Sequence, residues 1–226
     1  MPETFPQTRI FQDTSPDLPQ QGLRADRGPR DLPKKIAEVE ADPNLIPTYQ
    51  DEVHFQAQTT ITSAWYKKGS APQVKSLPGN HKVSYSGFIR QDTGQLFVHK
   101  PDWFTFGTTI DGVREYIRVT PIEEGKKFAL IMDNAPWHKK AIRLIEDEKN
   151  LEYADIREKV VFIKLPPYSP DLNPIEQVWR ITRREYTHNV FFNNKAALEA
   201  KVDEAFAKWA TPNEQLQTLC SFKRKD

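Results

Sequence analysis

The chain has 226 residues, a formal net charge of +1 and a single cysteine, Cys220. Because the net charge is close to zero, any basic surface for nucleic acid must be local, and one cysteine excludes both a disulfide framework and a zinc site built from cysteines. No apolar stretch is long enough to span a bilayer, and the polar, proline-rich start does not resemble a signal peptide. We therefore expect a cytoplasmic protein that makes no contact with a membrane.

The first 46 residues differ in composition from the rest of the chain. Eight of the 18 prolines lie within the first 50 positions. Prolines spaced in this way interrupt both helical and strand periods. We interpret residues 1–46 as a linker or arm, with one short helix over residues 34–40.

Residues 47–212 carry the alternation of strands and helices that is typical of an α/β domain. Apolar and β-branched runs predict strands at 48–55, 81–89, 95–99, 128–133 and 159–165. The second and third of these strands are joined at Asp92-Thr-Gly94, a good hairpin turn. Helical periodicity predicts helices at 104–119, after Asp133 through Ile145, from Asn173 through Thr182, and at 194–209. This order predicts a mixed β-sheet flanked by helices, and we interpret residues 213–226 as a basic tail.

Two segments carry most of the chemical information, Phe128–His138 and Val160–Arg180. Each begins with a short apolar run of the kind that forms a fully buried strand. Asp133 follows the first run directly, and Glu176 follows the second after a proline-rich turn. Carboxylates placed beyond the C-terminal ends of parallel strands share one edge of a sheet, where ligands bind. Such an acidic pair indicates a site for a divalent metal ion.

A third acidic group lies in the strand at 48–55. Asp51 and Glu52 alternate along the strand, so only one of them faces the site. Three carboxylates brought together repel one another unless cations neutralise them. Oxygen ligands select Mg²⁺ or Mn²⁺, and a pair of such ions is a common device for phosphoryl transfer.

Simpler interpretations exist for the two later acids. Asp133 could cap the helix that follows its strand. Glu176 could form a capping box with Asn173, which we expect to be the N-cap of its helix with Pro174 at the first helical position. The residues alone leave these alternatives open.

Two runs resemble the signature of mariner-type DDE transposases, in their prokaryotic insertion-sequence branch. They are Asp133-Asn-Ala-Pro-Trp-His138 and Tyr168-Ser-Pro-Asp-Leu-Asn-Pro-Ile-Glu176, and the similarity extends over residues 46–209. The resemblance implies a ribonuclease H-like fold. It also implies that Asp51, Asp133 and Glu176 are the catalytic residues and the ligands of two Mg²⁺ ions, for which Mn²⁺ can substitute.

The resemblance further implies a reaction and its partners. Strands are hydrolysed at the transposon ends, and the freed 3′-hydroxyl attacks target DNA. In this family the loop after the first strand, here residues 65–79, implies a homodimer. Because such an enzyme acts on DNA, the resemblance also implies association with the nucleoid. The family's helix-turn-helix modules are not recognisable in residues 1–46, so we expect this chain to be the catalytic domain. The 42 residues between Asp133 and Glu176 exceed the mariner spacing. We interpret 146–158 as a charged connection and expect it to account for the excess.

Other polar residues are candidates for supporting roles. We expect Asn134 and His138 to lie beside the metal ligands or to face DNA, because an oxygen-rich site leaves little place for an imidazole ligand. Charged helix faces are often merely solvated, but some basic residues flank the expected site and are candidates for phosphate contacts. They are Lys67, Lys68, Lys139, Lys140, Arg143, Arg180, Arg183 and Arg184.

Two other functions fit the sequence less fully. One is an inactive or domesticated transposase remnant that dimerises or binds DNA non-specifically. The other is a different two-metal nuclease on the same fold.

Overall fold

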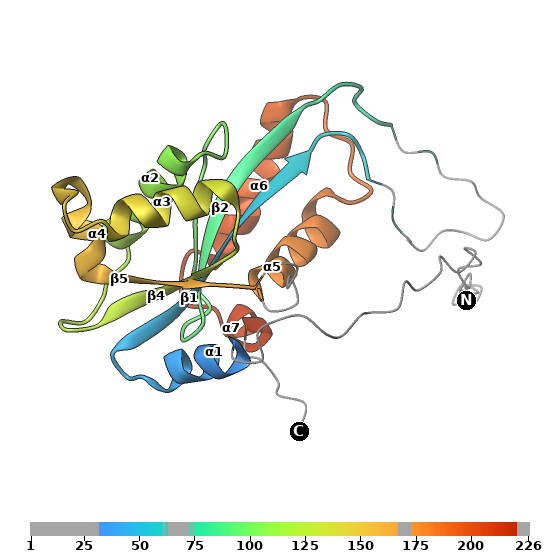
Figure 1. The fold of residues 1–226 in the computed structure, drawn as a ribbon. Helices are drawn as coiled ribbons and strands as arrows, with labels where there is room; N and C mark the ends of the chain where they lie inside the picture. The colour runs from blue at the N-terminus through green and yellow to red at the C-terminus, as the bar shows by residue number, and fades with distance from the viewer. Residues whose placement is uncertain (1–31, 61, 63–72, 74, 167–172, 221–226) are drawn as a thin grey trace, which may run out of the picture.

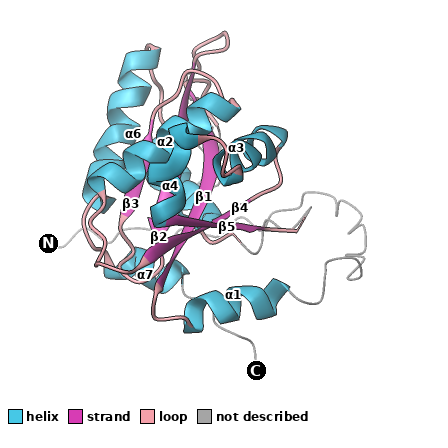
Figure 2. Cartoon of the chain, turned by 60° about the vertical axis from the view of Figure 1, so that its left-hand side comes forward, coloured by secondary structure: helices cyan, strands magenta, loops and turns pink. Residues whose placement is uncertain are grey.

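The computed structural model describes residues 32–60, 62, 73, 75–166 and 173–220. Five strands form one mixed sheet in the order β3-β2-β1-β4-β5, with helices on both faces (Figures 1 and 2). The α/β fold predicted from the sequence is therefore confirmed. The strands are β1 (Leu45–Gln56), β2 (Lys82–Arg90), β3 (Leu96–His99), β4 (Lys127–Met132) and β5 (Val160–Lys164). The helices are α1 (Leu32–Ala41), α2 (Phe106–Val119), α3 (Pro136–Glu146), α4 (Ala154–Lys159), α5 (Ile175–Thr182), α6 (Lys195–Trp209) and α7 (Glu214–Cys220).

Strand β1 lies at the centre of the sheet. It pairs antiparallel with β2 and parallel with β4, and β2 and β3 form the predicted hairpin. Tyr49 of β1 is the partner of Ile131 of β4. Continuing this register by two residues brings Asp51 level with Asp133, so the topology sets two of the predicted site residues side by side.

The sheet separates two hydrophobic cores. On one face, Tyr49, Val53 and Phe55 of β1 pack in a core shared with α1, α5, α6 and α7. On the other face, residues of β1, β2 and β4 pack against α2, α3 and α4. Since successive side chains of a strand point to opposite faces, Asp51 is directed to the layer of α5 and Glu52 to the layer of α3.

Both ends of the described chain extend the fold beyond the predicted boundaries of 47 and 212. Ile36 and Val39 of α1 are buried, and α1 packs against β1. At the other end, Leu216 and Cys220 of α7 are buried within a segment that we interpreted as a tail. Residues 1–31 and the basic residues 223–225 lie outside the described part of the chain. In that part, none of the helices combines the length and the apolar composition needed to cross a bilayer.

Two expectations about the later part of the chain need correction. Strand β5 is not fully buried, because it is the edge strand and Val161 remains 36% exposed. The stretch 146–158 is not a plain connection. It forms a 3₁₀ turn (Leu151–Tyr153) and α4, and Arg157 Nη1 donates to the carbonyl oxygens of Ile145, Asp147 and Asn150 at 2.7, 3.0 and 2.9 Å. This guanidinium ties the insertion to the end of α3.

Gly87 of β2 is the cross-strand partner of Asp51. A Cβ atom at this position would overlap the ring of Trp179, and it would lie 3.1 Å from Ile175 Cδ1. The bare backbone of Gly87 thus makes room for the α5 tryptophan over the sheet.

We predict that Gly87→Ala lowers the free energy of unfolding by about 1–3 kcal/mol, because the added methyl group displaces the buried Trp179 ring. Urea denaturation measures the change. Gly107→Ala in the first turn of α2 is the control, since its Cβ would approach nothing closer than Thr105 Oγ1 at 3.7 Å. We expect the control to change stability by less than about 1 kcal/mol. Equal stability of Gly87→Ala and wild type would contradict this packing.

Candidate active site

Asp51 is held from the α5 side of the sheet. Trp179 is 1% exposed, and its Nε1 donates a hydrogen bond of 3.0 Å to Asp51 Oδ2. Burial raises the pKa of Asp51, the nearby charges of Glu176 and Glu52 raise it further, and the Trp179 bond only partly opposes them, so that the pKa reaches about 8. Carboxylates are therefore crowded here in the absence of a cation.

Asp133 is the first residue after β4, and its side chain is half exposed. Its Oδ1 accepts a hydrogen bond of 2.8 Å from the backbone N–H of Ala135 and one of 2.6 Å from His138 Nδ1. The bond from His138 contributes most to lowering the pKa of Asp133, and the bond from Ala135 adds to it. Ala135, not Asp133, is the N-cap residue of α3. The alternative that Asp133 merely caps this helix is not supported.

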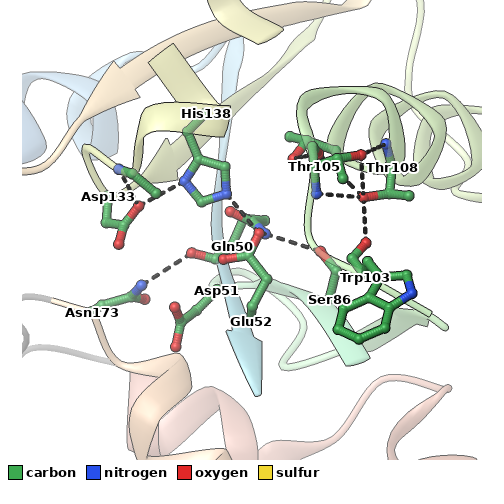
Figure 3. A network of polar contacts seen from close by, with 12 residues as sticks. Gln50, Asp51, Glu52, Ser86, Trp103, Thr105, Thr108, Asp133, His138 and Asn173 are labelled. Carbon is green, nitrogen blue, oxygen red and sulfur yellow. Dashed lines mark hydrogen bonds and ion pairs between the residues drawn. The ribbon is translucent and has the colours of Figure 1, made fainter. Parts of the chain in front are cut away.

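His138 is fully buried between two carboxylates (Figure 3). Besides its bond to Asp133, its Nε2 lies 2.6 Å from Oε1 of Glu52, whose side chain is 9% exposed. Burial alone would lower the pKa of His138, but the hydrogen bonds to Asp133 and Glu52 outweigh it and raise the pKa to about 9. A protonated imidazole donates from both ring nitrogens, so His138 joins the two acids.

Glu52 is the site residue that the sequence did not reveal. Alternation correctly directed it away from Asp51, but nothing local indicated that α3 places His138 opposite it. Its Oε1 also accepts from Gln50 Nε2 at 3.1 Å, and the same Nε2 lies 2.9 Å from Ser86 Oγ. These contacts form a polar row on the α3 face of the sheet, from Asp133 to Ser86.

Glu176 lies exposed in the first turn of α5, and its charge contributes to the raised pKa of Asp51. The capping box with Asn173 is not formed, and Asn173 is not the N-cap: α5 begins at Ile175 after Pro174. The amide of Asn173 instead donates to the backbone carbonyl of Gln50 at 3.0 Å. Because Gln50 belongs to β1, this hydrogen bond joins the start of α5 to the central strand and does not cap the helix.

The carboxylates suit a hard divalent cation, since all three offer oxygen ligands. A cation would relieve the repulsion between Asp51 and Glu176. The buried Oδ1 of Asn173, close to Asp51 in Figure 3, has no hydrogen-bond partner in the described part of the chain. Within that part, no three His, Cys, Asp or Glu side chains are already arranged around a common point that could hold a metal ion.

The remaining predicted residues take separate positions. Asn134 Nδ2 donates to the Leu165 carbonyl, which joins the ends of β4 and β5. Lys139, Lys140, Arg143 and Arg180 are exposed on α3 and α5, Arg183 lies over the Phe55 ring at 5.5 Å, and Arg184 pairs with Glu185. Lys67 and Lys68 lie outside the described residues, as does most of the segment 65–79.

Comparison with known proteins identifies the family. The profile of the DDE superfamily endonucleases matches residues 48–199, a range that contains Asp51, Asp133 and Glu176. An uncharacterised protein, y4pE/y4sA of Sinorhizobium fredii, is 32% identical over 73 residues, which are 32% of this chain and 46% of that protein.

Among solved structures, the Mos1 mariner paired-end complex with Mn has a TM-score of 0.58 at 16% identity, covering 83% of this chain and 55% of the Mos1 chain. The Mos1 paired-end complex with the left transposon end has a TM-score of 0.55 at 17% identity, covering 83% and 54%. The fold is thus shared with a transposase, and this chain spans about half the length of each of these relatives. Because the family profile matches residues 48–199, which is more than half of the chain, the chain belongs to the DDE superfamily endonuclease family.

Proposed function

We propose that this chain is the catalytic domain of a DNA transposase, which hydrolyses strands at transposon ends and joins the freed 3′-hydroxyl to target DNA. The observation that carries the proposal is that the register of β1 and β4 brings Asp51 level with Asp133 and that the charge of Glu176 in α5 acts on Asp51. Membership in the endonuclease family and the fold shared with Mos1 support it.

We propose Asp51, Asp133 and Glu176 as ligands of two Mg²⁺ ions, with Mn²⁺ as a substitute. Structures of Mos1 complexes with Mn and with Mg support the use of divalent metal. Such ions, when bound, activate the attacking water or hydroxyl and stabilise the leaving oxygen.

The protein's own contribution is to hold these carboxylates in position. Trp179 fixes one oxygen of Asp51, and His138 fixes one oxygen of Asp133. Partners that orient a ligand in this way reduce the reorganisation needed at the reaction centre. Exposed Lys139, Lys140 and Arg180 are suited to hold phosphates near the site.

The assembly is also part of the proposal. We propose a homodimer formed through residues 65–79, which handles transposon ends and target DNA. We propose that the chain belongs to the prokaryotic insertion-sequence branch, which its motifs resemble, and that it is a cytoplasmic protein that joins the nucleoid when bound to DNA.

We predict that Asp51→Asn, Asp133→Asn and Glu176→Gln each abolish nicking of supercoiled plasmid DNA in Mn²⁺, because each removes a charged metal ligand. Circular dichroism checks that the variants fold. Glu148→Gln replaces an exposed acid just beyond the C-terminal end of α3 and should nick like wild type. Full activity in any of the three variants would remove that residue from the triad.

The alternative functions predict other results. A wild type that is inactive on DNA even when fused to a DNA-recognition module would favour the non-catalytic alternative. A preference for RNA–DNA hybrid or branched DNA would favour another nuclease.

A second prediction concerns metal binding. We expect calorimetry to detect saturable Mn²⁺ binding to the wild type and to Glu148→Gln, but not to Asp51→Asn. Without metal at pH 7, Asp51→Asn should be at least as stable as the wild type. The crowding that raises the pKa of Asp51 costs the wild type stability, whereas the amide is neutral and its oxygen can still accept from Trp179. Unchanged Mn²⁺ binding by Asp51→Asn would contradict the ligand assignment.

A third prediction tests the buried contact of His138 with Glu52. His138→Leu should lower the free energy of unfolding by about 3–5 kcal/mol, because it leaves the carboxylate of Glu52 buried without its charged partner. The double variant His138→Leu/Glu52→Met should recover part of this loss, since both polar partners are then replaced by apolar groups. Urea denaturation of both single variants and the double variant completes the cycle. Additive losses would show that the two residues are not coupled.

A further inference from the structure

A hollow of about 260 Å³ lies on the sheet beyond the polar row, and no step of the proposed mechanism uses it. It is lined by Asn80, Lys82, Ser84, Pro101, Asp102, Trp103 and Lys195. These residues come from the start of β2, the turn after β3 and the start of α6. The hollow therefore joins three separate parts of the fold.

Trp103 is its most unusual member, because the side chain is 70% exposed. Its backbone is nevertheless fixed: the carbonyl oxygen accepts a hydrogen bond of 2.9 Å from Thr108 Oγ1 in the first turn of α2. The next residue, Phe104, stacks on His54 with ring centroids 4.7 Å apart. The fold thus supports an indole ring that it does not bury.

Two lysines line the hollow together with this ring. Lys82 Nζ lies 5.6 Å from the centroid of Trp103, and Lys195 lines the hollow at the N-terminus of α6, an end that favours anions. Neither lysine forms an ion pair with a carboxylate in the described residues. Asp102 also lines the hollow, so its lining carries two positive charges and one negative charge.

The hollow continues the polar row that leads away from the candidate site. Lys82, Ser84 and Ser86 alternate along β2, and they therefore share one face of the sheet. Ser86 ends the polar row, and Figure 3 shows it in one view with Trp103, His138 and Asp133. Ser84, which lines the hollow, bonds His54 at 3.0 Å.

We propose that this hollow binds one nucleotide of the DNA strand on which the active site acts, with the base stacked on Trp103 and the phosphate between Lys82 and Lys195. An aromatic ring beside free cations is the arrangement that binds single-stranded nucleic acid without sequence preference. Lys82 and Ser86 are four positions apart on β2, which is roughly 13 Å along the strand. This inference rests on the proposed function, because it takes DNA as the substrate.

The test is the affinity of the whole chain for a short fluorescein-labelled oligothymidylate, measured by anisotropy in EDTA so that no cleavage occurs. Trp103→Ala should bind about ten-fold more weakly or worse, the loss expected for one base–aromatic stack. Trp103→Phe keeps a ring and should retain most of the affinity. Leu151→Ala removes another exposed apolar side chain, 80% exposed at the opposite edge of the sheet, and should bind like wild type.

The lysines are tested by the dependence of affinity on salt. Lys82→Ala and Lys195→Ala should each reduce the slope of log affinity against log salt concentration by about 0.7, the value for one phosphate contact to a single strand. Lys149→Ala, an exposed lysine next to the control Leu151, should leave the slope unchanged.

Three outcomes would overturn the inference. They are undetectable binding by the wild type, equal affinity of Trp103→Ala and wild type, and a change of Trp103→Ala from dimer to monomer in sedimentation without loss of DNA affinity. Failure of the proposed function gives a different result. Asp133→Asn should lose plasmid nicking and keep oligonucleotide affinity, so normal nicking by Asp133→Asn would refute the triad while leaving the result for Trp103 intact.

Discussion

The site depends on the alternation of side chains along β1, which sends two consecutive acids to opposite faces of the sheet. Asp51 meets Trp179 of α5, and Glu52 meets His138 of α3. Each layer of helices thus supplies one N–H donor to one acid of the central strand. Because each carboxylate is held by a ring that is itself buried, changes in helix packing on either face would be transmitted to the site.

Charge is unevenly distributed around this strand. On the α3 side, the positive charge of His138 is shared by Glu52 and Asp133, and the pKa of Asp133 is lowered. On the α5 side, Asp51 faces Glu176 with a tryptophan N–H as its hydrogen-bond donor, and its pKa is raised. The carboxylates on the α3 side therefore have a charged partner, whereas those on the α5 side have none among the described residues. A divalent cation would bind most favourably on the α5 side, because it would relieve the repulsion that raises the pKa of Asp51.

The surroundings of the site serve this arrangement. Gly87 leaves space for Trp179, Asn173 ties the start of α5 to β1, and Asn134 joins the ends of β4 and β5. Each of these residues acts on the backbone that carries an acid, without being an acid itself. The segment 146–158 follows the C-terminal end of α3, whereas Asp133 precedes the start of this helix.

Local patterns alone determined the strands, the hairpin at Asp92–Gly94 and the buried face of α6, because hydrophobic period and turn residues are properties of neighbouring positions. The motifs similarly indicated Asp51, Asp133 and Glu176.

The wrong predictions concern residues whose structure depends on a partner far away in the sequence. Asn173 fits the pattern of an N-cap, yet its amide bonds β1. The β5 run is as apolar as a buried strand, yet it lies at the sheet edge. The segment 214–220 is short and mostly polar, yet it forms a helix whose Leu216 and Cys220 are buried. Only the tertiary structure could place His138 between Glu52 and Asp133, or gather Trp103 with Lys82 and Lys195, because these contacts join residues that are far apart in the chain.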